Sequence, residues 1–90
     1  MTMVRRRALV AGRVQGVFYR DTLRREAVRR GVHGFARNLA DGRVELELEG
    51  DEEAVQAVIG YASAGPSRAL VTQVVVDAIE PTGATGFVIG

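Results

Sequence analysis

The stretch best suited to chemistry runs from Gly12 to Arg20, with the sequence Gly-Arg-Val-Gln-Gly-Val-Phe-Tyr-Arg. Residues 8–11 before it are predicted to end a strand, and residues 21–30 after it to form a helix. Glycines in such a turn let backbone N–H groups converge, because glycine tolerates a positive φ. Converging N–H groups beside a helix N-terminus favour an anion, and the forked guanidinium of Arg20 could bind a phosphate there. The glycines alone are explained equally well by a tight structural turn.

A second polar candidate is Asn38, the one asparagine of the chain. It ends a predicted strand just before the turn signal Asp41-Gly42, at the sheet edge where the turn after the first strand would also emerge. A carboxamide both donates and accepts hydrogen bonds, so it could hold a water molecule while contacting an oxyanion. Asparagine also commonly caps a hairpin through its own backbone. From the residues alone, the capping role is favoured over the chemical one.

Composition excludes several kinds of catalytic site. The chain has no cysteine, which excludes disulfides, thiolate nucleophiles and cysteine-bound metals. All twelve basic residues are arginine, which excludes Schiff-base and P-loop lysines. His33 has no neighbouring histidine or carboxylate at metal-ligand spacing, so we expect it at an exposed or edge position rather than on a metal. A net charge of +1 gives no general electrostatic argument for nucleic acid binding.

Length and hydropathy indicate one globular domain. Ninety residues, 47% of them hydrophobic and 26% charged, are ordinary for such a domain, so we expect residues 1–90 to form a single unit. The apolar run Ala8–Ala11 after three arginines is too short for a signal peptide, and no run is long enough to span a bilayer. We therefore expect a cytoplasmic protein, and the short chain and even charge favour a monomer.

Hydrophobic periodicity predicts alternating strands and helices. The clearest strand is residues 43–49, where Val44, Leu46 and Leu48 alternate with charged residues. The full prediction is strands at 4–12, 32–38, 43–49, 70–80 and 87–89, and helices at 18–30 and 52–62, the second with Asp51 as its N-cap. This β-α-β-β-α-β order with a short closing strand predicts an α+β, ferredoxin-like α/β sandwich. Its two helices would pack on one face of an antiparallel sheet.

Three local expectations follow from that topology. The first and third strands would be neighbours, so Arg5 and Arg7 could neutralise Glu45 and Glu47 on the open face of the sheet. Imperfect alternation in residues 70–80 indicates a bulge or a bend. The buried stripe of the first helix, spaced at i, i+4 and i+8, is predicted to be Tyr19, Leu23 and Ala27.

Two motifs together resemble the acylphosphatase family. The stretch Gly12–Arg20 is similar to the family signature in which Gly-Arg-Val-Gln-Gly-Val leads to an aromatic residue and then arginine. The stretch Gly34-Phe35-Ala36-Arg37-Asn38 is similar to a second signature, and Gly42, Val44 and Gly50 follow it at the family spacing. Residues 87–89 are similar to the family's closing strand, so the resemblance covers nearly the whole chain. Two motifs at the right separation are far more specific than either alone.

The resemblance implies a hydrolase that splits acyl phosphates into carboxylate and orthophosphate without metal or cofactor. By the resemblance, Arg20 binds the phosphate and Asn38 positions the attacking water. The substrate's own phosphate is implied to accept the proton, because the family shows no dedicated protein base. The implied phosphate-binding loop, acting through its backbone amides, consists of Gln15, Gly16, Val17, Phe18 and Tyr19.

The chain departs from the family pattern at two positions. Phe18 and Tyr19 place two aromatic residues where the family usually has one, and we expect Phe18 to pack outward at the mouth of the pocket. Arg30 stands where an apolar residue is typical of the last turn of this helix. The first departure would affect access to the pocket, and the second would affect stability more than activity.

Two other classes of function remain as alternatives. Ferredoxin-like sheets often bind RNA by stacking bases on aromatic residues of the third strand, but Glu45, Glu47 and Glu49 occupy those outward positions here. A catalytically silent anion-binding or regulatory module is the second alternative, and retention of both Arg20 and Asn38 argues against it. The expected partners are thus a small-molecule acyl phosphate and water, with no nucleic acid and no membrane.

Overall fold

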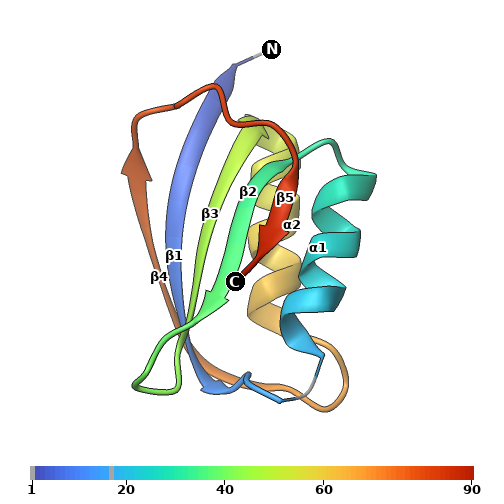
Figure 1. Cartoon of the computed structure of the whole chain (residues 1–90), viewed down its shortest axis with the longest axis vertical. Helices are drawn as coiled ribbons and strands as arrows, with labels where there is room; N and C mark the ends of the chain where they lie inside the picture. The colour runs from blue at the N-terminus through green and yellow to red at the C-terminus, as the bar shows by residue number, and fades with distance from the viewer. Residues whose placement is uncertain (1, 17) are drawn as a thin grey trace.

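The computed structural model describes residues 2–16 and 18–90, and it has the predicted order of elements (Figure 1). Boundaries differ from the prediction by one or two residues at most strand and helix ends, and the short closing strand has the predicted limits. The elements are β1 (Met3–Arg13), α1 (Tyr19–Arg29), β2 (His33–Asn38), β3 (Val44–Asp51), α2 (Glu52–Ala64), β4 (Leu70–Ile79) and β5 (Phe87–Ile89). No helix among these residues is long and apolar enough to cross a membrane.

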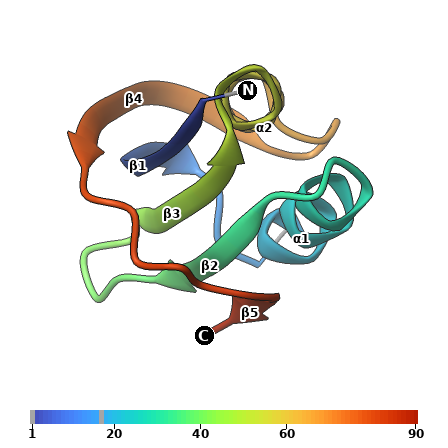
Figure 2. The same ribbon diagram turned by 90° about the horizontal axis from the view of Figure 1, so that it is seen from above.

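The described strands form one five-stranded sheet in the order β4-β1-β3-β2-β5. The four longer strands are antiparallel to their neighbours, as predicted, whereas β5 pairs in parallel with β2, so the complete sheet is mixed. Both helices cover the same face of this curved sheet (Figure 2). Helix α1 packs on β2 and β5, and α2 packs on β1, β3 and β4. The predicted ferredoxin-like sandwich is therefore confirmed.

Helix α1 presents the predicted stripe to the core. Tyr19, Leu23 and Ala27 are all buried, and they pack against the buried face of α2. The hydroxyl of Tyr19 donates a hydrogen bond to the carbonyl oxygen of Ala62 at 2.6 Å, which joins the two helices. Burial raises the pKa of the Tyr19 hydroxyl, so this group stays protonated and remains a donor.

The predicted N-cap of α2 is only partly correct. Asp51 does stand at the N-cap position, but its side chain makes no capping hydrogen bond. The chain enters α2 directly from β3, and the N–H of Glu52 donates to the carbonyl oxygen of Thr2 at 2.9 Å instead. A backbone partner from the N-terminal segment thus satisfies an amide that sequence patterns assign to a side-chain cap.

The predicted irregularity of β4 is a β-bulge near the end of β1. Ala11 pairs with Gln73, but Gly12 pairs with Val71, so Thr72 is the extra residue. At this point Gly12 has a φ of +126°, and a Cβ atom there would lie 2.0 Å from the carbonyl oxygen of Leu70. Gly12 is therefore required by the close approach of two strands rather than by the turn that follows.

Arginines and glutamates neutralise one another on the open face of the sheet, as predicted. Arg5 lies opposite Glu49 in the register and contacts the carboxylates of both Glu47 (2.7 Å) and Glu49 (2.9 Å). Arg7 reaches diagonally to Glu45 at 2.6 Å. The pairing extends beyond the predicted set to Glu49, which Arg5 contacts, and to Arg37 of β2, which pairs with Glu45.

Glu49 also holds the loop that leads into β5. Its carboxylate accepts hydrogen bonds from the backbone N–H groups of Thr82 (2.7 Å) and Gly83 (2.8 Å) as well as from Arg5. These contacts, led by the Thr82 N–H, lower the pKa of Glu49 from its ordinary 4.5 to about 2.

This low pKa predicts acid sensitivity. A carboxyl group whose pKa is lower in the folded chain stabilises the fold above its unfolded pKa of about 4.3, and this stabilisation is lost as the pH falls toward 2. We expect the thermal midpoint of the wild type to exceed that of Glu49→Gln at pH 6, and the gap to narrow steadily between pH 4.5 and pH 2.5 without closing. Circular dichroism melts measure both midpoints. The exposed Glu80→Gln serves as control, and a gap that stayed constant over this range would contradict the assignment.

Candidate active site

The loop between β1 and α1 has the backbone geometry of an anion-binding site. Phe18, the N-cap of α1, is left-handed at φ 59° and ψ 22°, and Gly16 also has a positive φ of 74°. A left-handed residue followed by right-handed helical residues turns successive N–H groups toward one point. Within the described part of the chain, the N–H groups of Gly16 and Phe18 have no backbone acceptor. These donors are therefore available to a ligand at the positive end of α1.

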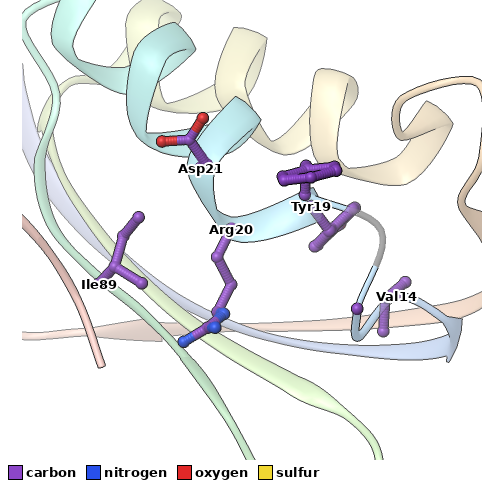
Figure 3. Close-up of a pocket in the computed structure, with 7 residues that line it drawn as sticks. Val14, Tyr19, Arg20, Asp21 and Ile89 are labelled. Atoms are coloured by element: carbon purple, nitrogen blue, oxygen red, sulfur yellow. The ribbon is translucent and has the colours of Figure 1, made fainter.

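A pocket of about 250 Å³ opens at this point (Figure 3). It combines loop residues with the first turn of α1 and one residue of β5. Its described lining consists of Val14, Gly16, Phe18, Tyr19, Arg20, Asp21 and Ile89. Ile89 was not among the predicted site residues, because nothing local in residues 87–89 indicates which helix end they face.

Arg20 supplies the positive charge of this pocket. Its side chain leaves the first turn of α1 and extends between Val14 and Ile89 in Figure 3. There it donates to the backbone oxygen of Gly90, and no described carboxylate forms a salt bridge with it. The neighbouring Asp21 points away from Arg20 in the same view. An anion in the pocket thus meets a guanidinium that pairs with no Asp or Glu side chain of the described residues.

The carboxylate of Asp21 forms salt bridges with two arginines of α1. Its carboxylate pairs with Arg24 at 3.2 Å and with Arg25 at 2.9 Å, at the i+3 and i+4 positions. Although Asp21 lines part of the pocket, its negative charge is directed toward these two arginines. The pocket therefore keeps a positive electrostatic character around Arg20.

Asn38 ends β2 at the end of the sheet where β1 also ends, but it is outside the described lining of this pocket. Strands β1 and β2 are both antiparallel to β3, so they run parallel to each other and their C-terminal ends share one edge. The side chain of Asn38 is exposed. The alternative hairpin-capping role falls to Asp41, whose carboxylate accepts from the Arg43 N–H at 3.1 Å. The carboxamide of Asn38 is thereby left for another partner.

The side chain of Gln15 links the loop between β1 and α1 to the hairpin that follows Asn38. Its amide nitrogen donates to the carbonyl oxygens of Leu39 at 2.9 Å and Arg43 at 3.0 Å. The family resemblance implied only a backbone role for Gln15. No local pattern could have paired it with two carbonyl groups more than twenty residues away. The contact sets the distance between the loop and the end of β2.

A protein-family model described as Acylphosphatase matches residues 6–89. The chain belongs to the acylphosphatase family. An acylphosphatase from Thermococcus kodakarensis is 52% identical to it, over 97% of this chain and 96% of the relative. One from Pseudomonas paraeruginosa is 49% identical over 91% of this chain and 90% of the relative. The crystal structure of acylphosphatase from Bacillus subtilis aligns with a TM-score of 0.92 at 34% identity, over 99% of both chains.

These similarities confirm the family and the hydrolase class expected from the two motifs. Both motifs, residues 12–20 and 34–38, lie inside the matched range. Of the residues predicted for an acylphosphatase site, Gly16, Phe18, Tyr19 and Arg20 line one pocket, and Gln15 lies beside it. Val17 is outside the described residues. Within the described residues, no group of three or more histidines and carboxylates is placed to hold a metal ion.

Proposed function

We propose that this protein hydrolyses acyl phosphates to a carboxylate and orthophosphate in the pocket at the N-terminus of α1. Arg20 and the loop N–H groups of Gln15, Gly16, Val17, Phe18 and Tyr19 bind the phosphate oxygens, and Asn38 positions the attacking water. The observation that carries the proposal is the position of Arg20. Its guanidinium, which pairs with no described Asp or Glu side chain, lies in the same pocket as the left-handed turn that opens the helix. Membership of the acylphosphatase family supports the same reaction.

The reaction requires little covalent chemistry from the protein. The water oxygen forms a bond to phosphorus, and the bond between phosphorus and the bridging oxygen breaks. The carboxylate leaves with that electron pair, and the proton of the water passes to a non-bridging oxygen of the phosphate. Because a carboxylate is a good leaving group, positioning and charge stabilisation supply most of the catalysis. Preorganised N–H groups and a guanidinium provide that stabilisation.

The open face of the sheet gives little support to the RNA-binding alternative. The outward positions of β3 are glutamates paired with Arg5 and Arg7, and they offer no aromatic surface for stacking. Phe35 on β2 is half-buried, and the guanidinium of Arg37 lies over its ring, 5.8 Å from the centroid. A base would have to displace this cation–π contact before it could stack.

The test is to incubate the protein with benzoyl phosphate in the presence of EDTA and to measure released inorganic phosphate. EDTA-resistant release well above the spontaneous rate is the expected result. A protein that binds inorganic phosphate in a calorimeter without releasing it from benzoyl phosphate would be a silent anion-binding module. Binding of a single-stranded RNA oligomer without turnover would support the RNA-binding alternative.

We also propose that residues 1–90 act as one acylphosphatase-like domain, as a cytoplasmic monomer without nucleic acid or membrane partners. The near-neutral net charge and the short chain support the monomer. The lack of cysteine supports the cytoplasm, because small secreted domains more often carry disulfides. Sedimentation velocity at micromolar concentration checks the monomer, for which a mass near 9.7 kDa is expected.

A further inference from the structure

We propose that the side chain of Gln15 is a positioning residue, which holds Asn38 at a fixed place relative to the loop between β1 and α1. This loop and the hairpin that follows Asn38 lie at the same end of the sheet in Figure 1, and Gln15 joins them. The inference rests on the proposed function, because it takes Asn38 as the residue that orients the attacking water. Gln15 acts through Asn38, and its side chain does not touch the substrate.

The contact requires an amide NH2 group. Both partners of Gln15 are carbonyl oxygens, on Leu39 at 2.9 Å and on Arg43 at 3.0 Å, so the side chain must donate to both. Its Nε2 atom carries two hydrogens and supplies one to each carbonyl. A glutamate of the same length would place an oxygen against two other oxygens. Because both hydrogens are used within the protein, the Gln15 amide has no donor left for a phosphate.

The hairpin between β2 and β3 closes without Gln15. The N–H of Leu39 donates to the carbonyl oxygen of Arg43 at 2.8 Å, and the N–H of Gly42 donates to the carbonyl oxygen of Leu39 at 3.1 Å. The carboxylate of Asp41 accepts from the Arg43 N–H at 3.1 Å. The two carbonyls that Gln15 reaches therefore already have partners inside the hairpin. The additional donor from another segment fixes where the hairpin lies relative to the loop.

Gln15 is the side-chain anchor in the middle of that loop. The approach to the loop is fixed where Gly12 lies against the carbonyl oxygen of Leu70 on β4, and its end is fixed by the hydrogen bond from Tyr19 to Ala62. Among the described residues between β1 and α1, Gln15 is the one whose side chain forms a hydrogen bond. The loop therefore keeps both ends when Gln15 is replaced, and what is lost is its connection to the hairpin.

Asn38 depends on this connection because its own side chain is exposed, so packing does not hold it in place. One planar peptide bond joins it to Leu39, whose carbonyl Gln15 holds. Asn38 also pairs with Val44, the residue after Arg43, in the ladder of β2 and β3. Gln15 thus holds the backbone next to this pair on both arms of the hairpin. A misplacement of about 1 Å between reacting groups can cost roughly a hundredfold in rate.

The kinetic test is a double-mutant cycle of Gln15→Met and Asn38→Ala with benzoyl phosphate as substrate. Methionine keeps the length of the side chain and removes the donor. We expect Gln15→Met to lower kcat about tenfold and to change the inhibition constant of inorganic phosphate less than about twofold. In the Asn38→Ala background, the same substitution should change kcat less than about twofold, because the group that Gln15 positions is gone.

The matched control is Gln56→Met, the same chemical change at an exposed position of α2, which should keep wild-type kinetics. Gln15→Asn is a second variant at the site. It keeps the amide but is one methylene group shorter, so it cannot span to both carbonyls, and we expect the same pattern as for Gln15→Met. Circular dichroism melts identify the variants that are folded and can be compared.

A spectroscopic readout that needs no turnover separates this inference from the proposed function. Asn38 is the one asparagine of the chain, so labelling asparagine alone with a nitrogen isotope gives one side-chain amide group in the NMR spectrum. We expect its signals to shift when inorganic phosphate is added to the wild type, and to shift much less at saturating phosphate in Gln15→Met. If the wild type did not hydrolyse benzoyl phosphate, the proposed function would fail, and this response would still decide whether Gln15 places Asn38 beside a bound anion.

Three results would overturn the inference. Equal losses of kcat from Gln15→Met in the wild-type and Asn38→Ala backgrounds would show that Gln15 acts independently of Asn38. A rise in the phosphate inhibition constant as large as the fall in kcat would show that Gln15 shapes the phosphate contacts instead. An Asn38 signal that is insensitive to phosphate in the wild type, or equally sensitive in Gln15→Met, would reject the placement itself.

Discussion

Arg20→Gln is expected to lower kcat/KM for benzoyl phosphate by two to three orders of magnitude while the fold is kept. Removing one preorganised donor to a developing negative charge typically costs about 3–4 kcal/mol of transition-state stabilisation. Here the substitution also removes the one cation among the described residues that line the pocket. The inhibition constant of inorganic phosphate should rise as well, because the guanidinium binds the ground-state phosphate too. Steady-state kinetics with phosphate as competitive inhibitor measures both effects.

The fold should survive this substitution, because the side chain of Arg20 contributes little to the core. Its recorded hydrogen bond goes to the exposed backbone oxygen of Gly90. Arg24→Gln is the matched control, since Arg24 lies on the same helix and pairs with Asp21 outside the phosphate contacts. We expect that variant to keep wild-type kinetics within about twofold. Wild-type turnover by Arg20→Gln, with an unchanged circular dichroism spectrum, would show that another group holds the phosphate.

Asn38→Ala is expected to lower kcat by a similar factor of roughly 10²–10³, with little change in phosphate inhibition. The reason is the position of Asn38. It lies at the shared edge of β1 and β2, it is exposed, and Asp41 already caps the hairpin. A carboxamide that orients water acts on the attacking nucleophile rather than on the bound phosphate.

The contrast with Arg20 is the informative part of this experiment. Asn38→Ala should separate kcat from phosphate affinity, whereas Arg20→Gln should change both. If Asn38→Ala weakened phosphate inhibition as strongly as it lowered kcat, Asn38 would be a phosphate ligand and the water would be held elsewhere. Near-normal turnover would remove it from the mechanism. Thermal melts of both variants check that the hairpin remains folded.

Much of the fold was predictable because it follows from local hydrophobic patterns in the sequence. Strict alternation in residues 43–49 predicted β3 to within two residues at either end, and the stripe led by Tyr19 predicted the buried face of α1. The details that escaped prediction depend on distant backbone. The N–H of Glu52 bonds to Thr2 instead of to a side-chain cap, and Gly12 is required by the carbonyl of Leu70. Each contact joins residues about fifty or more positions apart, so a local sequence pattern cannot reveal it.

The residues of the site also fall into those that local sequence patterns predicted and those that they missed. The loop and Arg20 are adjacent in sequence, so their motif predicted a shared pocket, and the structure has it. Ile89 and the side chain of Gln15 were missed, because their roles arise from contacts between segments far apart in the chain. Asn38 lies between these cases. Topology predicted its edge of the sheet, while its contact with a water molecule stays a prediction.

The two hydrogen bonds from Gln15 couple the turn between β2 and β3 to the loop between β1 and α1. One side chain reaches carbonyl groups on both arms of that hairpin, Leu39 and Arg43, so the separation of those arms and the placement of the loop between β1 and α1 cannot vary independently. The tip at Ala40 and Asp41 is exposed and would ordinarily tolerate inserted residues. In this chain, an insertion that broke the 2.8 Å hydrogen bond from the Leu39 N–H to the Arg43 carbonyl would also move the two acceptors of Gln15, so the length of this turn and the loop between β1 and α1 are coupled.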